Sequence, residues 1–290
     1  MKLAVQYPAD SLGSDPDHLR GFAQAAEAAG YSRLVFAEHV LGADPDRPGG
    51  WTGAYTHKNH WPEPFTTFGF LAAVTERIEL MTGVLVLPQR QTVIVAKQAA
   101  QIDVLSKGRI VLGVGTGWNA VEYHGLGQDF ATRGRRLEEQ IGLLRRLWSE
   151  PVLTFKGEFD QVDRAGLNPL PTRGDIPIWI GGSGGRVLDR VGRIADGWFP
   201  LLLRPADTAA GLDRIRESAS AAGRNPKAIG VMCMVTETGN PKKQLEMAGR
   251  YREAGATDLV LSVQSDPSLL TLDQHVEALT RFAEGVRAAE

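Results

Sequence analysis

The chain has 290 residues, which is long for an average domain but ordinary for a single α/β barrel. Its 32 basic and 34 acidic residues give a formal net charge of −2 and form no basic block, which excludes a surface built for nucleic acid or for an anionic membrane. Cys233 is the only cysteine, so no disulfide can form within the chain. The apolar stretch before Pro8 is too short for a signal peptide or a membrane span, and we expect a cytoplasmic protein.

Short β-branched segments alternate with longer helical segments along the chain. The expected strands are, in order, 2–7, 33–37, 78–87, 109–114, 176–180, 197–201, 229–235 and 258–263. The expected helices are 17–29, 65–75, 92–106, 133–149, 185–194, 207–221, 242–254 and 272–288. Near-continuous apolar strands that alternate with helices indicate a parallel sheet covered on its outside. Eight such repeats predict one domain over 1–290, a single (β/α)8 TIM barrel, rather than an open doubly wound sheet.

Two long segments interrupt the alternation. Val40–Pro64 follows the second strand and is rich in proline, glycine and aromatic residues. Loops longer than about a dozen residues are often functional, and loops that follow barrel strands lie on the face that carries the site. We therefore expect this segment to form a lid or a substrate wall. Pro151–Arg173 lies between the fourth helix and the fifth strand, so it starts from the opposite face, and Lys156-Gly157 within it marks the turn of a hairpin.

Two glycine-rich segments follow predicted strands. Gly113–Asn119 (GVGTGWN) permits close approach of a phosphate or a flat ring, although a tight turn out of the barrel would use the same residues. It does not fit a dinucleotide fingerprint, because no acidic residue ends a following strand about twenty residues later. Gly181–Gly185 (GGSGG) combines a strand end with a helix N-terminus, which is the arrangement that binds phosphate, or it forms only a flexible loop.

His39 stands at the carboxyl end of the second strand. A histidine there faces the bowl of a barrel and can exchange a proton near neutral pH, or it can cap the strand through backbone hydrogen bonds. His57 and His60 in the following loop line a substrate wall or lie at the surface. The spacing of His, Cys, Asp and Glu indicates no metal site, and no nucleophile elbow is present. Gly83 lies inside the third strand and indicates a bulge or a close backbone approach.

Four segments together resemble the bacterial luciferase-like family. They are IELMTGVLVLPQRQTVIVAKQAAQIDVLSKGRIVLGVGTGWNAVEYHGLG at 78–127, TRGR at 132–135, IPIWIGGSGG at 176–185 and ADGWFP at 195–200. The combination is far more specific than any one glycine loop, and nearly the whole chain takes part. The compact length is similar to that of members that use the deazaflavin coenzyme F420, because it lacks the large insertions common in FMN-dependent monooxygenases.

The resemblance implies a role for each of several residues. His39 matches the histidine that faces the deazaflavin ring and assists hydride transfer. The residues implied to hold the cofactor are Gly83 and Val84 at a non-prolyl cis peptide behind the ring, Thr116 and Gly117 beside the ring, and Gly181, Gly182 and Ser183 at its phosphate. One departure concerns Trp118, which stands where sugar-phosphate dehydrogenases of this family place a catalytic glutamate, and that reaction is therefore not expected here.

The mechanism expected from this resemblance is hydride transfer between C5 of the deazaflavin and a small organic substrate stacked on the ring. His39 is the expected proton donor or acceptor. Aromatic side chains give apolar area with a polar handle, and the expected pocket wall consists of Trp51, Tyr55, Trp61 and Trp118. The expected partners are a diffusible flavin or F420 reductase and, in a homodimer, a second copy that packs on helices near strands 2 and 3.

Two other functions stay open on the sequence, and a third lacks the residues that it would need. An FMN-dependent monooxygenase on the same barrel would use reduced flavin and oxygen. A protein that binds a flavin or deazaflavin without turnover would have no substrate. A barrel isomerase or aldolase would need a lysine or paired carboxylates at strand ends, whereas Lys97 and Lys107 fall on the third helix and its exit.

Overall fold

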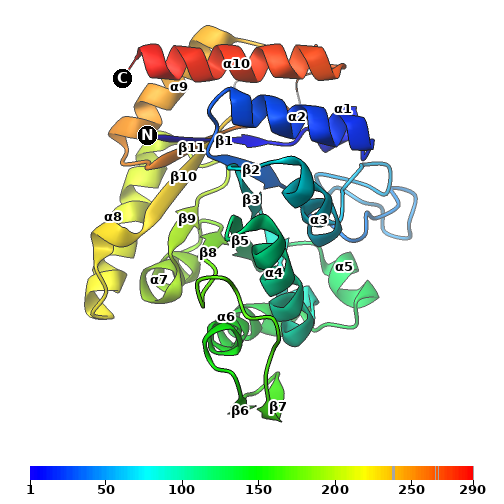
Figure 1. Cartoon of the computed structure of the whole chain (residues 1–290), viewed down its shortest axis with the longest axis vertical. Helices are drawn as coiled ribbons and strands as arrows, with labels where there is room; N and C mark the ends of the chain where they lie inside the picture. The colour runs from blue at the N-terminus through cyan, green and yellow to red at the C-terminus, as the bar shows by residue number, and fades with distance from the viewer. Residues whose placement is uncertain (237–238, 265, 267, 290) are drawn as a thin grey trace.

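Nine of the strand segments that the structure describes form one closed parallel barrel (Figure 1). This computed structural model describes residues 1–236, 239–264, 266 and 268–289. The barrel segments are β1 (Lys2–Gln6), β2 (Arg33–Phe36), β3 (Glu79–Thr82), β4 (Leu85–Val86), β5 (Ile110–Gly115), β8 (Ile178–Gly181), β9 (Gly197–Phe199), β10 (Gly230–Val235) and β11 (Asp258–Leu261). They pair in the order β3-β2-β1-β11-β10-β9-β8-β5-β4, and the pairing of β3 with β5 closes the sheet. Because β3 and β4 are parts of one barrel strand, the predicted eight-stranded barrel is confirmed.

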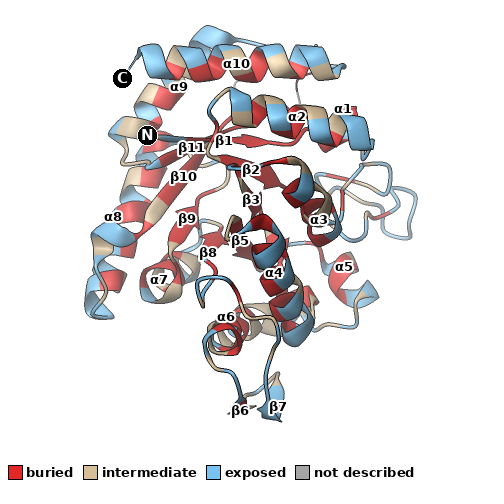
Figure 2. Ribbon diagram, in the orientation of Figure 1, coloured by how far each residue is buried: buried red, intermediate tan, exposed pale blue. Residues whose placement is uncertain are grey.

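Helices cover the outside of the barrel. They are α1 (Ala9–Leu12), α2 (Pro16–Ala28), α3 (Pro64–Val74), α4 (Thr92–Ser106), α5 (Ala120–Gly125), α6 (Arg133–Ser149), α7 (Gly185–Ile194), α8 (Pro205–Ala221), α9 (Pro241–Glu253) and α10 (Leu272–Ala288). Buried residues gather on the strands and on the helix faces turned toward them (Figure 2). Helix starts follow local signals: Thr271 and Gln274, for example, form a capping box at the start of α10. No described helix is long and apolar enough to cross a membrane.

The third barrel strand is broken, which corrects the prediction of one continuous strand over 78–87. β3 ends at Thr82 and β4 begins at Leu85, and the peptide bond between Gly83 and Val84 is cis. Thr82 donates its hydroxyl hydrogen to the Gly113 carbonyl at 2.6 Å. Gly113 must be glycine for this approach, since a Cβ there would overlap the Thr82 carbonyl oxygen. The break places the Val84 side chain at the carboxyl end of the barrel.

Side chains fill the barrel interior toward its amino-terminal end. The interior cluster consists of Ala4, Val35, Met81, Val111, Trp179, Phe199, Met232 and Val260. Below it, buried Arg33 forms ion pairs with Glu79 at 2.7 Å and Asp258 at 3.2 Å, and its guanidinium lies 4.9 Å from the Trp179 ring centre. Packed side chains and these ion pairs thus occupy the amino-terminal half of the interior, and in barrels of this type ligands bind at the carboxyl end of the strands.

The segment between α6 and β8 contains the predicted hairpin. β6 (Leu153–Lys156) and β7 (Gln161–Ala165) pair antiparallel, and the Gly157 N–H donates to Asp160 O in the turn. The carboxylate of Glu139 on α6 accepts hydrogen bonds from the backbone N–H groups of residues 158, 159 and 160. The hairpin is therefore fixed on α6 and lies beyond it in Figure 1, away from β1 and β2.

Candidate active site

The 40–64 segment folds over the carboxyl end of β2. In Figure 1 it is the long loop between β2 and α3, beside α1. Asp10 on α1 accepts hydrogen bonds from the Asn59 side chain and from the His60 N–H, and His60 Nε2 lies 2.7 Å from Ser14 Oγ. Within the segment, Trp51 donates its indole hydrogen to Tyr55 O at 2.6 Å. These contacts fix the segment, which was predicted to form a lid or a substrate wall, against α1 and the residues that follow it.

The 40–64 segment and Trp118, which precedes α5, bring together around His39 the four residues predicted for the pocket wall. The His39 ring stacks on Tyr55 with 3.7 Å between ring centres, and Trp61 meets it edge-on at 4.9 Å. Trp118 lies 6.3 Å from His39 and stacks on Trp51 at 5.8 Å. Tyr55 is buried, whereas Trp118 is 47% exposed and forms the outer edge of the cluster. The arrangement surrounds one titratable ring with apolar faces.

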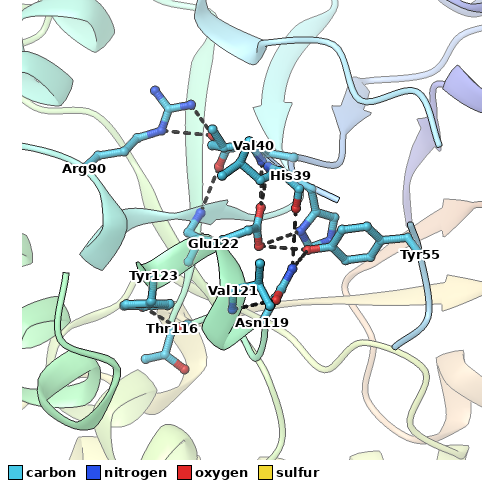
Figure 3. A network of polar contacts seen from close by, with 12 residues as sticks. His39, Val40, Tyr55, Arg90, Thr116, Asn119, Val121, Glu122 and Tyr123 are labelled. Atoms are coloured by element: carbon cyan, nitrogen blue, oxygen red, sulfur yellow. Dashed lines mark hydrogen bonds and ion pairs between the residues drawn. The ribbon is translucent and has the colours of Figure 1, made fainter. Parts of the chain in front are cut away.

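A buried carboxylate that the sequence reasoning missed completes this cluster. Glu122 on α5 is 1% exposed, and its two oxygens accept four hydrogen bonds (Figure 3). Oε1 accepts from the N–H groups of Val40 at 2.7 Å and Leu41 at 3.2 Å. Oε2 accepts from the Tyr55 hydroxyl at 2.8 Å and lies 3.3 Å from His39 Nδ1. One side chain thus connects α5 to the start and to the middle of the 40–64 segment and to the histidine.

Hydrogen bonding decides the charge of this network. Burial would raise the pKa of Glu122, but the hydrogen bonds from His39, Tyr55 and the Leu41 N–H outweigh burial and hold the pKa below its ordinary value. Burial and the neighbouring Glu122 raise the pKa of the Tyr55 hydroxyl. At neutral pH the pair is therefore a carboxylate that accepts from a neutral phenol.

A second buried carboxylate anchors the chain behind the break in the third barrel strand. Glu38 accepts a hydrogen bond from the Val86 N–H at 3.0 Å and forms an ion pair with Arg90, which also contacts Glu63 at 3.2 Å. Burial raises the pKa of Glu38, and the Arg90 charge opposes that shift. These three residues line a cavity of about 350 Å³ together with His39, Val40, Trp61 and Leu126. Two carboxylates face one guanidinium there, so the cavity is unfavourable for an anionic ligand.

Val84 forms part of an apolar floor at the carboxyl end of the barrel. It packs on the interior cluster together with Leu201 and Met234. A Cβ at Gly115 or Gly181 would lie 2.7 Å or 2.8 Å from a Val84 methyl group. The glycines at the ends of β5 and β8 therefore leave room for Val84, which gives them a packing reason besides the predicted contact with a cofactor.

The predicted phosphate loop is only partly free. The Gly182 N–H donates to Phe199 O at 3.1 Å, so this amide is already engaged, which corrects its predicted role as a phosphate donor. Ser183 is exposed, and α7 begins at Gly185 without a side-chain cap. Within the described residues, no backbone N–H from Ser183 to Arg186 donates a hydrogen bond. These groups can still bind an anion at the helix N-terminus.

A cavity of about 390 Å³ adjoins this helix N-terminus and is lined by four arginines. It is lined by Thr116, Ala131, Arg133, Gly134, Arg135, Arg186, Val187 and Arg190. Arg190 is buried and donates to Gly134 O at 3.0 Å, while Arg186 is exposed and has no hydrogen bond or ion pair within the described residues. Guanidinium groups of this kind bind phosphate and carboxylate groups.

Thr116 and Gly117 lie at the edge of this cavity, where the predicted cofactor site would continue. The Thr116 carbonyl accepts a hydrogen bond from the Tyr123 hydroxyl at 2.7 Å. Gly117 has a φ of +61°, and a Cβ there would lie 2.6 Å from a Val86 methyl group, so the turn requires glycine. Among the described residues, no group of three or more His, Cys, Asp or Glu side chains could hold a metal ion.

A sequence profile described as luciferase-like monooxygenase matches residues 2–250. The chain belongs to the luciferase-like monooxygenase family. An uncharacterized protein of Mycobacterium tuberculosis is 32% identical over 276 residues, which cover 92% of this chain and 93% of the relative. A phthiodiolone/phenolphthiodiolone dimycocerosates ketoreductase of the same organism is 33% identical over 175 residues, which cover 58% of this chain and 45% of the ketoreductase.

Solved structures show the same luciferase-like fold. An F420-dependent secondary alcohol dehydrogenase, in complex with an F420-acetone adduct, superposes with a TM-score of 0.82 over 99% of both chains at 16% identity. At this identity the likeness establishes the barrel and its connections. The luciferase-like family therefore accounts for the fold, and the side chains at the carboxyl end carry the argument about function.

Proposed function

We propose that this luciferase-like protein is an oxidoreductase that transfers a hydride between the deazaflavin coenzyme F420 and a small organic substrate. The observation that carries the proposal is the division of the barrel mouth into three parts. The apolar floor at Val84 packs against the glycines at the ends of β5 and β8, and the arginine-lined cavity lies near these strand ends. His39 follows β2, which pairs with β3 of the broken strand, and lies within the aromatic cluster. Such a mouth offers an anion site, a flat apolar surface and a proton-exchanging group.

The arginine-lined cavity supports F420 rather than FMN. F420 carries a phosphate followed by glutamate carboxylates, whereas FMN ends in one phosphate. Arg135 pairs with Glu158 at 2.7 Å and Arg190 with Glu138 at 3.4 Å, whereas Arg133 and Arg186 form no ion pair within the described residues and remain available to an anionic tail. When bound, the deazaflavin supplies a hydride carrier that reacts poorly with oxygen. Arg186 and the free N–H groups at the start of α7 would hold its anionic end, and Val84 would support its ring.

The chain itself supplies the proton and a dry surface. Reduction of a carbonyl adds a hydride to carbon and a proton to oxygen, and oxidation of an alcohol reverses both steps. His39 is placed to give or take the proton, while Trp61 and Trp118 exclude water beside it. The relative named a ketoreductase supports a carbonyl or hydroxyl substrate. Since Glu38 and Glu63 outnumber Arg90 in the cavity beside His39, the proposed substrate is neutral and carries no phosphate.

Parallel fluorescence titrations of the apo-protein with oxidised F420 and with FMN test the cofactor assignment. We expect F420 to bind at low micromolar concentration and FMN much more weakly. Arg186→Gln removes one charge-assisted contact, and we expect a roughly 10-fold loss of F420 affinity from about 1.4 kcal/mol. Arg281→Gln, on the exposed face of α10, is the matched control with unchanged affinity.

The other outcomes lead to different functions. Tight FMN binding with weak F420 binding would contradict the proposal and indicate a monooxygenase that uses reduced flavin and oxygen. F420 binding without turnover of any carbonyl or alcohol would indicate a binding protein. If neither cofactor binds, the assigned anion site and ring support are wrong.

We also propose that two copies of the chain associate through α3 and α4, and that a diffusible reductase supplies the reduced cofactor. Four apolar residues on the outer face of α4 are 40–52% exposed: Val93, Ile94, Val104 and Leu105. An apolar helix face of this kind is typical of a contact between subunits. Light scattering of the wild type and of Ile94→Glu tests the association, with a dimer expected for the first and a monomer for the second. A monomeric wild type would contradict it.

A further inference from the structure

The hydrogen positions around His39 follow from one backbone contact. Asn119 precedes α5, and its Oδ1 accepts a hydrogen bond from the Val121 N–H at 3.0 Å (Figure 3). The amide orientation is therefore fixed, and Asn119 Nδ2 faces the Tyr55 hydroxyl at 2.7 Å as a donor. The Tyr55 oxygen accepts this hydrogen and donates its own to Glu122 Oε2 at 2.8 Å.

Glu122 can only accept. Its Oε1 already accepts from the Val40 and Leu41 N–H groups, and a carboxylate carries no hydrogen to give. The hydrogen between Glu122 Oε2 and His39 Nδ1, which are 3.3 Å apart, must therefore belong to the imidazole. We propose that Glu122 is a positioning residue that holds neutral His39 in the tautomer protonated at Nδ1, so that the Nε2 lone pair can accept the proton of a substrate hydroxyl, and the imidazolium formed in this way returns that proton when the reaction runs toward the alcohol.

The same contacts couple the tautomer to closure of the lid. Val40, Leu41 and Tyr55 belong to the 40–64 segment and supply three of the four hydrogen bonds to Glu122. An open lid would leave the carboxylate without these donors. The tautomer of His39 is therefore expected to depend on the 40–64 segment being in the position that the structure shows. The catalytic meaning of this inference rests on the proposed function, in which His39 moves the proton, whereas the tautomer itself rests only on the hydrogen-bond geometry.

The test is an NMR spectrum of the histidine ring nitrogens in ¹⁵N-histidine-labelled apo-protein, because protonated and bare ring nitrogens differ in chemical shift. His39→Gln assigns the His39 signals by their loss. We expect neutral His39 in the wild type to be protonated at Nδ1 and bare at Nε2. Glu122→Gln retains an oxygen for the Val40 and Leu41 N–H groups but turns an NH₂ group toward His39 Nδ1. Nδ1 must then accept, and the hydrogen moves to Nε2.

Tyr55→Phe is the matched control, because it removes a donor from the same carboxylate without replacing the acceptor for His39. We expect Tyr55→Phe to retain the Nδ1-protonated tautomer of His39, whereas a general disturbance of the cluster would not preserve this tautomer. A wild type protonated at Nε2, or a Glu122→Gln spectrum equal to that of the wild type, would overturn the inference. Should Glu122→Gln fail to fold by circular dichroism, the wild-type spectrum still decides. None of these spectra needs a cofactor, so a failure of F420 to bind leaves this result separate.

Discussion

Acidification should destabilise this fold through His275 on α10, which is 0% exposed. His275 Nε2 lies 2.8 Å from Ser11 Oγ, and Ser11 donates its own hydrogen to Pro8 O, so the histidine donates from Nε2. Nδ1 has no hydrogen-bond partner within the described residues. Burial lowers the pKa of His275 from 6.5 to about 4, and the negative charge of Asp266 opposes this shift only in part.

The direction and the magnitude of the stability change follow from the pKa of His275 in the unfolded chain, 6.5, and in the folded protein, about 4. Between pH 6.5 and about 4 the unfolded chain binds a proton at His275 that the folded protein does not bind. The free energy of unfolding therefore falls as the pH drops below about 6.5, and the loss from this group is complete below about 4. The difference in pKa corresponds to about 3 kcal/mol in full and to about 2 kcal/mol at pH 5.

Urea unfolding at about pH 7.5 and about pH 5 measures this loss. His275→Gln retains a donor toward Ser11 and cannot take up a proton, so its unfolding free energy should fall between the two pH values by about 2 kcal/mol less than that of the wild type. His57→Gln, at an exposed lid position, is the matched control and should follow the wild type. Parallel losses in the wild type and His275→Gln would refute the reasoning.

Two further substitutions test the packing and the buried charge near the site. Gly113→Ala places a Cβ against the Thr82 carbonyl oxygen and should lower the free energy of unfolding by about 3 kcal/mol. Gly142→Ala is the control, because a Cβ there has open space on α6, and it should raise the free energy of unfolding by up to about 1 kcal/mol. Equal effects of the two substitutions in urea unfolding would contradict the geometry. Arg90→Ala leaves the Glu38 carboxylate buried without its partner and should lower the free energy of unfolding by about 3–5 kcal/mol in the same assay. A decrease below about 1 kcal/mol would show that this ion pair does not anchor the strand end.

Local patterns in the sequence predicted most of the fold. The helices expected over 92–106, 133–149, 185–194 and 272–288 have those bounds in the structure, because apolar periodicity and terminal residues are local signals. The break after β3 was expected only as a bulge at Gly83, since pairing with β5 decides where the ladder stops. α5 was missed because a six-residue helix shows too little periodicity.

Site residues could be predicted from the sequence only where the residue type and its position relative to a predicted strand indicated a role. His39 follows from its position after β2, and the resemblance to luciferase-like proteins indicated the cis bond at Gly83-Val84. Glu122 was missed because its contact with His39, 83 positions away, arises only from the tertiary fold. An acidic residue in the turn after the Asn119 cap was the available signal. The contribution of Arg133, Arg135 and Arg190 to the anion site was not predicted, because the cavity combines α6 and α7, which come together only in the tertiary fold.

The most direct test of the central claim is anaerobic turnover of reduced F420 with a panel of neutral ketones, enones and aldehydes, followed by the return of the oxidised deazaflavin spectrum. The account predicts substrate-dependent reoxidation by the wild type and a 10²- to 10⁴-fold slower reaction by His39→Gln, because a positioned general acid contributes roughly that factor. Equal rates in the two proteins would contradict the role of His39. Bound F420 that no member of the panel reoxidises, or turnover that requires FMN and oxygen, would contradict the proposed function.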